Sequence, residues 1–190
     1  PIVIDGTMSD PAWADLPWSD DFVDITGQDE LKPHFRTRVK MGWDDEFFYV
    51  GAELEEPHVW GTITEKNAVM FEDNDFEVFI DPDCDGLNYY EFEINAFNTL
   101  YEGFFIWQEA YRRAGYNKIP ALNRSRPEVE SQEFNGVGLK SHPRGKRWAY
   151  LQWDFPGVRT AVHIDGTLND HSDRDRGWTV ELAFPWRGMQ

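Results

Sequence analysis

The fold follows from two adjoining stretches, Asn74-Asp75-Phe76-Glu77-Val78-Phe79-Ile80-Asp81-Pro82-Asp83-Cys84-Asp85-Gly86 and Tyr89-Tyr90-Glu91-Phe92-Glu93-Ile94-Asn95. Apolar and polar residues alternate along both, which is typical of half-buried β-strands. The Asp- and Gly-rich segment between them is a turn signal, so the two stretches predict a hairpin. One face of this hairpin would be apolar, and the other would carry Glu and Asn side chains.

The same alternation recurs along most of the chain. Residues 36–43 and 47–54 form a second predicted hairpin, joined by Asp44-Asp45-Glu46. Further strands are expected at 100–107, 148–153, 160–164 and 178–184, with a single helical turn at 10–14. The segment 108–135 is the least periodic and is expected to be a long surface loop with a short helix. About eight to ten short strands predict an all-β, antiparallel β-sandwich of the jelly-roll or immunoglobulin-like kind, with few helical turns.

Length and charge limit the possible classes of protein. A chain of 190 residues is expected to form one domain, 1–190. The net charge of −17 argues against binding to nucleic acid or to anionic membranes, and it is compatible with neutral ligands and bound cations. No apolar run approaches the ~18 residues of a membrane-spanning helix, so no membrane insertion is expected. We expect the domain to be cut at its C-terminal end or to be part of a longer protein.

The polar face of the first hairpin carries Glu77, Glu91, Glu93 and Asn95. If the strand at 36–42 is a neighbour, its Arg36, Arg38 and Lys40 side chains join that face. Two interpretations stay open: a solvated face stabilised by cross-strand ion pairs, or a floor whose polar groups bind sugar hydroxyls. The candidate hydroxyl contacts are Arg38, Glu77 and Asn95.

Tryptophan is abundant: the chain contains nine Trp residues, in addition to 14 Phe and 7 Tyr. An indole offers a large apolar surface on which a sugar ring can stack. Some tryptophans occupy apolar periodic positions and are expected in the core: Trp13, Trp18, Trp43 and Trp178. The candidate stacking platforms lie in a polar loop or at strand ends: Trp60, Trp107 and Trp153.

The turn at 81–86 resembles the opening of a calcium-binding loop, because carboxylates alternate and a Gly follows. The EF-hand pattern would need Glu at its twelfth position, where this chain has Phe92, and its flanks would be helices. The sequence therefore excludes an EF-hand. It leaves either a structural calcium site of another kind, with Asp81, Asp83 and Asp85 as ligands, or a turn without metal.

Catalytic alternatives depend on the same strands. Glu77, Glu91 and Glu93 could supply the acid and base of a carbohydrate-active enzyme, which needs two carboxyl groups about 5–5.5 or about 6.5–9.5 Å apart. A DOMON-like haem- or redox-associated domain would need axial ligands such as Met41 or Met70 with a histidine. Met41 falls on the inward side of its strand, which favours a core position. A purely structural adhesion or spacer domain is a further alternative.

Several motifs together resemble the family 9 carbohydrate-binding modules, in the branch found in secreted bacterial proteins. They follow one another from end to end of the chain: Ile4-Asp5-Gly6 with Trp13, 39–45 with 48–50, 75–82, 90–95, 165–169 and 177–186. The resemblance implies a β-sandwich, non-catalytic binding of saccharide ends or short glycans, structural calcium in some members, and attachment to catalytic or surface modules. The segment 108–135 departs from the compact module.

We therefore predict a non-enzymatic domain that binds a polysaccharide or oligosaccharide. The expected location is secreted, periplasmic or on a bacterial cell surface.

Overall fold

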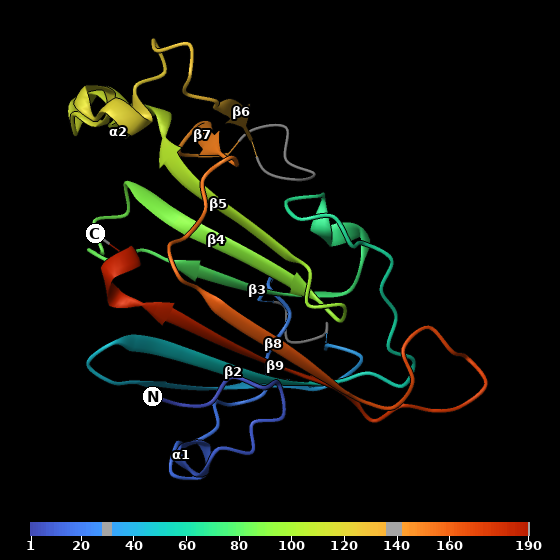
Figure 1. The fold of residues 1–190 in the computed structure, drawn as a ribbon. Helices are drawn as coiled ribbons and strands as arrows, with labels where there is room; N and C mark the ends of the chain where they lie inside the picture. The colour runs from blue at the N-terminus through green and yellow to red at the C-terminus, as the bar shows by residue number, and fades with distance from the viewer. Residues whose placement is uncertain (28–31, 136–141, 190) are drawn as a thin grey trace.

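The computed structural model describes residues 1–27, 32–135 and 142–189, and its strands form two antiparallel sheets packed face to face (Figure 1). The strands are β1 Thr37–Trp43, β2 Phe47–Glu55, β3 Asp75–Ile80, β4 Asn88–Asn95, β5 Leu100–Trp107, β6 Gln132–Phe134, β7 Arg147–Tyr150, β8 Arg159–Asp165 and β9 Gly177–Pro185. The helical elements are all short: α1 Pro11–Ala14, α2 Gln108–Arg113, and the 3-10 turns η1 Met70–Glu72, η2 Tyr116–Lys118, η3 Pro120–Leu122 and η4 Trp186–Gly188.

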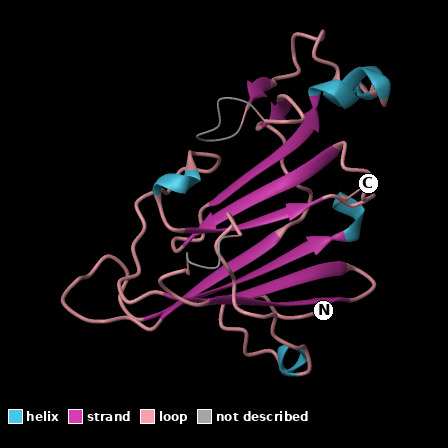
Figure 2. Cartoon of the chain, turned by 180° about the vertical axis from the view of Figure 1, so that it is seen from behind, coloured by secondary structure: helices cyan, strands magenta, loops and turns pink. Residues whose placement is uncertain are grey.

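Sheet A has the strand order β1-β2-β9-β8, and sheet B has the order β3-β4-β5-β7-β6. Seen from behind, the two sheets remain separate layers, with helices only at the periphery (Figure 2). This arrangement confirms the predicted all-β antiparallel sandwich. Both predicted hairpins are present, because β1 pairs with β2 and β3 pairs with β4.

The core lies between the sheets and is built from alternate residues of the strands. Phe92 and Ile94 of sheet B and Leu182 and Phe184 of sheet A are fully buried there. Their neighbours along each strand point to the outer faces. The period of two therefore decides which side chains can reach a ligand on an outer face.

The N-terminal segment covers the outer face of sheet A and carries α1 (Figure 1). Trp13 is 2% exposed, as expected for a core residue, but it packs outside the sandwich with Phe47 and Tyr49. The carboxylate of Glu181 on β9 is fully buried beneath this segment. It accepts hydrogen bonds from the backbone amides of Asp5 and Gly6 and from the Trp13 indole.

Two predicted core residues of β1 are instead exposed. Met41 is 53% exposed and Trp43 is 76% exposed, although both lie on the same side of the strand as buried Val39. β1 is the edge strand of sheet A, and these residues lie at the tip of its hairpin, at an outer corner of the sandwich. Alternation predicts on which side of a strand a residue lies. It does not predict how far the opposite sheet extends to cover that side.

The segment 108–135 is more ordered than predicted. It contains α2, η2, η3 and β6, and β6 extends sheet B through its pairing with β7. Within the residues that the structure describes, no helix has the length and apolar character needed to span a bilayer.

Candidate functional site

The predicted polar face exists on the outer side of sheet B. The β3–β4 register sets Glu77 opposite Glu93 and Phe79 opposite Glu91. The expected contribution of Arg36, Arg38 and Lys40 to this face is wrong, since β1 pairs with β2 in sheet A and never meets β3 or β4. Acidic side chains therefore dominate the face without the basic neighbours that the sequence interpretation required.

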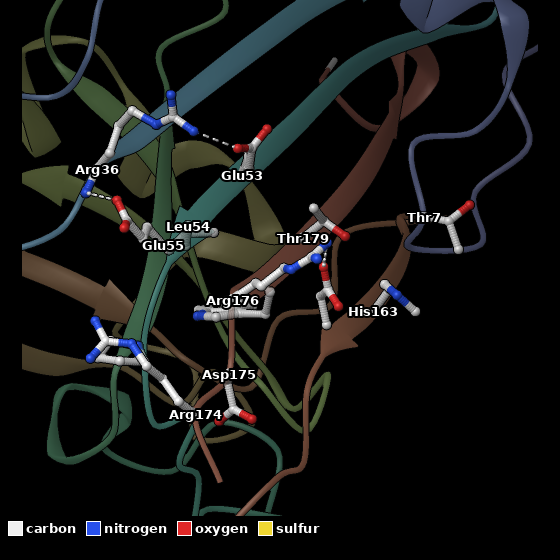
Figure 3. A pocket seen from close by; sticks show the side chains of 14 residues that line it. Thr7, Arg36, Glu53, Leu54, Glu55, His163, Arg174, Asp175, Arg176 and Thr179 are labelled. Atoms are coloured by element: carbon white, nitrogen blue, oxygen red, sulfur yellow. Dashed lines mark hydrogen bonds and ion pairs between the residues drawn. The ribbon is translucent and has the colours of Figure 1, made fainter.

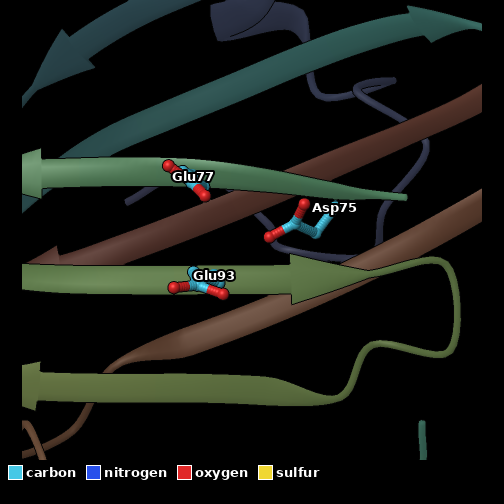
Figure 4. A group of neighbouring side chains, drawn as sticks. All are labelled: Asp75, Glu77 and Glu93. Carbon is cyan, nitrogen blue, oxygen red and sulfur yellow. The ribbon is translucent and has the colours of Figure 1, made fainter. Parts of the chain in front are cut away.

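Asp75, Glu77 and Glu93, which we call the carboxylate triad, form the most acidic part of this face (Figure 4). One carboxylate oxygen from each lies within 4.8 Å of the others. Glu93 is only 8% exposed, whereas Glu77 is open to solvent. Among the described residues, no Lys or Arg nitrogen lies within 4 Å of a triad oxygen. The repulsion within the triad is therefore not cancelled by an ion pair.

Burial and mutual repulsion change the acidity of this cluster. Burial, reinforced by Glu77 and Glu93, raises the pKa of Asp75 to about 7. Burial and the neighbouring Glu91 and Glu77 raise the pKa of Glu93 to about 8. Burial also raises the pKa of Glu91 to about 7. The cluster therefore favours either bound protons or a bound cation at neutral pH.

Asn95, a predicted sugar contact, is fully buried. Its amide nitrogen donates to Asp73 at 2.9 Å and to the Ile63 carbonyl at 2.8 Å. Its carbonyl oxygen accepts from the backbone amides of Phe97 and Thr99. All the polar atoms of this side chain are used to hold loops together, so Asn95 does not reach a ligand in this arrangement.

The predicted tryptophans lie on different surfaces. Trp107 is 8% exposed and is covered by His142, Arg144 and Arg147. Trp60 is 37% exposed, and its ring stacks on His171 with centroids 4.4 Å apart. Trp60 therefore keeps part of its ring accessible, while Trp107 is sealed by cationic side chains.

Trp153 lines a cavity, which we call the edge pocket. One side of its ring stacks on Tyr90, with centroids 4.9 Å apart. The cavity measures about 310 Å³, and its polar lining includes Gln152, Arg126 and Glu128. Arg126 donates from Nε to Glu128 at 2.8 Å. The segment 108–135 supplies one wall of this pocket, so the most irregular part of the sequence helps to build a concave surface.

A larger groove of about 710 Å³ lies at the end of sheet A (Figure 3). Arg36 pairs with Glu53 at 2.9 Å, and Arg176 pairs with Asp165 at 3.6 Å. Its only lining indole belongs to Trp178, which is 2% exposed. The groove therefore offers polar groups without an accessible aromatic ring. Sequence analysis missed it because distant segments build it.

Arg38 projects from the outer face of sheet A. It forms an ion pair with Glu53 at 2.9 Å, and its guanidinium lies 4.2 Å from the centre of the Trp18 ring. Arg38 and Glu77 therefore lie on opposite outer faces of the sandwich and cannot contact one sugar ring. The predicted contacts do not form a single site.

Asp81, Asp83 and Asp85 do converge, with one oxygen from each within 4.8 Å of the others. Asp81 accepts from the Gly86 amide at 2.9 Å, and Asp85 accepts from the Leu87 amide at 2.7 Å. Gly86 has a φ of +68°, which a Gly adopts without steric cost. We call this segment the acidic turn. These hydrogen bonds fit a turn with or without a cation.

The catalytic alternative uses Glu77, Glu91 and Glu93, which share the outer face of sheet B. None of them lines a cavity described above. The two methionines of the haem alternative are separated: Met41 is exposed on sheet A, and Met70 is buried with Tyr101 and Phe105.

Comparison with solved structures finds a chain that shares this fold. A protein from Bacteroides uniformis ATCC 8492, described as a candidate carbohydrate-binding protein, matches with a TM-score of 0.59 and 14% identity, covering 97% of this chain and 68% of that chain. A family 9 carbohydrate-binding module from Caldicellulosiruptor kristjanssonii, solved with cellotriose, matches with a TM-score of 0.43 and 15% identity, covering 95% of this chain and 79% of that chain. No curated protein sequence gives a significant match.

The sequence itself matches a known family over more than half of its length. The matched residues, 4–118, run from the N-terminal segment on sheet A to the start of the segment that walls the edge pocket. They include both hairpins and the carboxylate triad. The chain therefore belongs to the carbohydrate family 9 binding domain-like family.

Proposed function

We propose that this chain is a non-catalytic carbohydrate-binding module that holds its sugar in the edge pocket. Membership of a carbohydrate-binding family supports the general function. The observation that carries the proposed location is that Trp153, alone among the predicted platforms, lines a described cavity together with paired polar groups.

The chemistry of the edge pocket suits a sugar. An indole packs well against the apolar face of a sugar ring, and its burial between Tyr90 and a ligand would keep it rigid. The guanidinium of Arg126 donates in a planar fork, and the carboxylate of Glu128 accepts, so the pair can bind adjacent hydroxyls. The volume of about 310 Å³ lies at the lower end of the range of ligand sites, which favours one or two sugar units.

Calorimetric titration with a panel of soluble glycans tests the location. We expect Trp153→Ala to weaken binding at least about tenfold, a loss of about 1.4 kcal/mol. Because Trp153 also packs on Tyr90, the exposed Arg126→Ala variant is a second test that leaves the core intact. Trp43→Ala is the matched control, since this indole is 76% exposed and lines none of the described cavities.

Unchanged glycan binding in both Trp153→Ala and Arg126→Ala would contradict the proposal that the sugar binds in the edge pocket. Loss of glycan binding in Trp60→Ala would instead indicate that the sugar binds at Trp60, the indole that stacks on His171. Absence of binding to every glycan, with and without calcium, would contradict the carbohydrate-binding function itself.

We also propose that the acidic turn binds a structural calcium ion through Asp81, Asp83 and Asp85. Oxygen ligands of this type suit calcium, and the convergence of three carboxylates supports the proposal. Calorimetric titration of chelator-treated protein with calcium tests this site. The combined substitution Asp83→Asn and Asp85→Asn should lower the number of calcium ions bound per chain by one. Glu109→Gln is the control, because this exposed residue lies on α2. Unchanged stoichiometry would contradict the proposal.

The proposed module has no catalytic activity and works outside the cytoplasm of a bacterium, where polysaccharides are available. Its family is one of binding domains, which supports the first point. Release of sugar from a chromogenic glycoside panel, abolished by Glu77→Gln, would contradict it. Fractionation of the producing cells would test the location, and attached catalytic or surface modules would be visible in the full-length gene product.

A further inference from the structure

The carboxylate triad contains buried oxygens that lack a hydrogen-bond donor. Glu93 Oε2 and Asp75 Oδ2 are buried and have no hydrogen-bond partner within the described residues. A buried carboxylate oxygen without a donor is costly, and nearby like charges increase that cost. Other buried carboxylates accept hydrogen bonds from amide, indole or ammonium groups: Glu56, Glu102, Asp175 and Glu181.

We propose that Asp75, Glu77 and Glu93 bind a divalent cation, calcium, on the outer face of sheet B. This site is separate from the acidic turn, because its ligands come from the middle and start of β3 and from β4. All three side chains project from the same face of the sheet and converge (Figure 4). The cation would supply the positive charge that no Lys or Arg of the described chain supplies.

The spacing fits calcium. Calcium lies about 2.3–2.6 Å from its oxygen ligands, so two ligands on one ion are at most about 5 Å apart. The triad oxygens lie within 4.8 Å of one another. Calcium also accepts irregular sets of carboxylate oxygens, whereas magnesium demands near-ideal octahedral geometry and keeps most of its water ligands, so this all-carboxylate cluster suits calcium better.

The sheet register gives the site its rigidity. Glu77 and Glu93 are Cα partners on neighbouring strands, and Asp75 precedes Glu77 by two residues on the same face. Asn95, the Cα partner of Asp75, is held by Asp73 and Ile63 and does not compete for the ion. Glu77 is exposed, so the ion would keep water ligands on its solvent side, where its remaining coordination positions lie.

The arginine that interacts electrostatically with neighbouring Glu91 contacts other groups. Arg147 donates to the Tyr89 hydroxyl at 2.5 Å, and its guanidinium lies over the rings of Trp107 and Phe134. It therefore forms no ion pair with the triad. The remaining alternative to a cation is a proton shared among the carboxylates.

Calorimetric titration of chelator-treated protein with calcium chloride, in the absence of sugar, tests the site. The titration is performed in the Asp83→Asn, Asp85→Asn background, so that the acidic turn cannot supply the signal. One equivalent of calcium should still bind. Glu93→Gln or Glu77→Gln added to this background should weaken binding at least tenfold, whereas Glu109→Gln should leave it unchanged.

Glu77 is solvent-exposed, so its substitution keeps the test valid if the buried Glu93→Gln variant misfolds; a thermal melt monitors folding of each variant. Absence of calcium binding in the background would overturn the proposal and would mean that protons alone neutralise the triad. Binding that neither substitution weakens would overturn it as well. Because no sugar is present, both outcomes are independent of the proposed carbohydrate binding.

Discussion

Glu181→Ala should lower the free energy of unfolding by about 3–5 kcal/mol, because each buried donor left without an acceptor costs about 1–3 kcal/mol. The Glu181 carboxylate is fully buried on β9. It accepts from the amides of Asp5 and Gly6 and from the Trp13 indole. Truncation would leave these donors without an acceptor beneath the N-terminal segment. The apolar cluster of Trp13, Phe47 and Tyr49 would then lose its anchor.

Urea denaturation followed by tryptophan fluorescence measures this change. Glu181→Gln should have a smaller effect, because the amide keeps one acceptor oxygen but turns an NH₂ group toward a donor. Glu53→Ala is the matched control on the neighbouring strand β2: its carboxylate is partly exposed and pairs with surface arginines, so its loss should cost less than about 1 kcal/mol. Similar costs for Glu181→Ala and Glu53→Ala would show that Glu181 does not anchor the segment.

In the presence of a chelator, the protein should be at least about 2 kcal/mol less stable at pH 9 than at pH 6. The folded-state pKa values of Asp75 and Glu91 are raised to about 7, and that of Glu93 to about 8. Above their ordinary values near pH 4, the folded state binds more protons than the unfolded state. The stabilisation that these protons provide is therefore fully present below about pH 4, and it is lost as the pH rises through the folded-state pKa values.

Urea denaturation at pH 6, 7, 8 and 9 measures the slope. Glu93→Gln should reduce the slope and stabilise the chelated protein at pH 9, because an amide carries no charge into the cluster. Arg147 lowers the pKa of Glu91, so Arg147→Gln should make the loss of stability with rising pH steeper. A stability profile that is flat or rises from pH 6 to pH 9 would contradict this account of the cluster.

The fold could be predicted because its signals are local. Alternation in 75–80 and 89–95 assigned Phe76, Phe92 and Ile94 to the core side correctly, and the acidic loop at 44–46 correctly predicted the β1–β2 hairpin. Trp43 shows the limit of this signal. Its side of the strand was predicted correctly, but its exposure depends on where the opposite layer ends, and no residue near Trp43 in the sequence encodes that.

The candidate sites needed more than alternation. Asp75 belongs to the carboxylate triad and was not predicted, although it lies two residues before Glu77 on the same face. A strand period of two could have identified it. Arg126 and Glu128 could not be identified in this way, because the edge pocket joins the segment 108–135 to Trp153, and a pocket between distant segments has no sequence period.

The sequence by itself determined an antiparallel sandwich, an acidic face on the β3–β4 hairpin and a cluster of aspartates in its turn, because strand period and turn chemistry act between residues close in the chain. Only the tertiary structure decided that β1 belongs to the opposite sheet, so that Arg38 lies far from Glu77. It also decided which indoles remain exposed. Sheet order and layer coverage depend on the free energy of packing the whole core, to which every strand contributes, and no single segment specifies them.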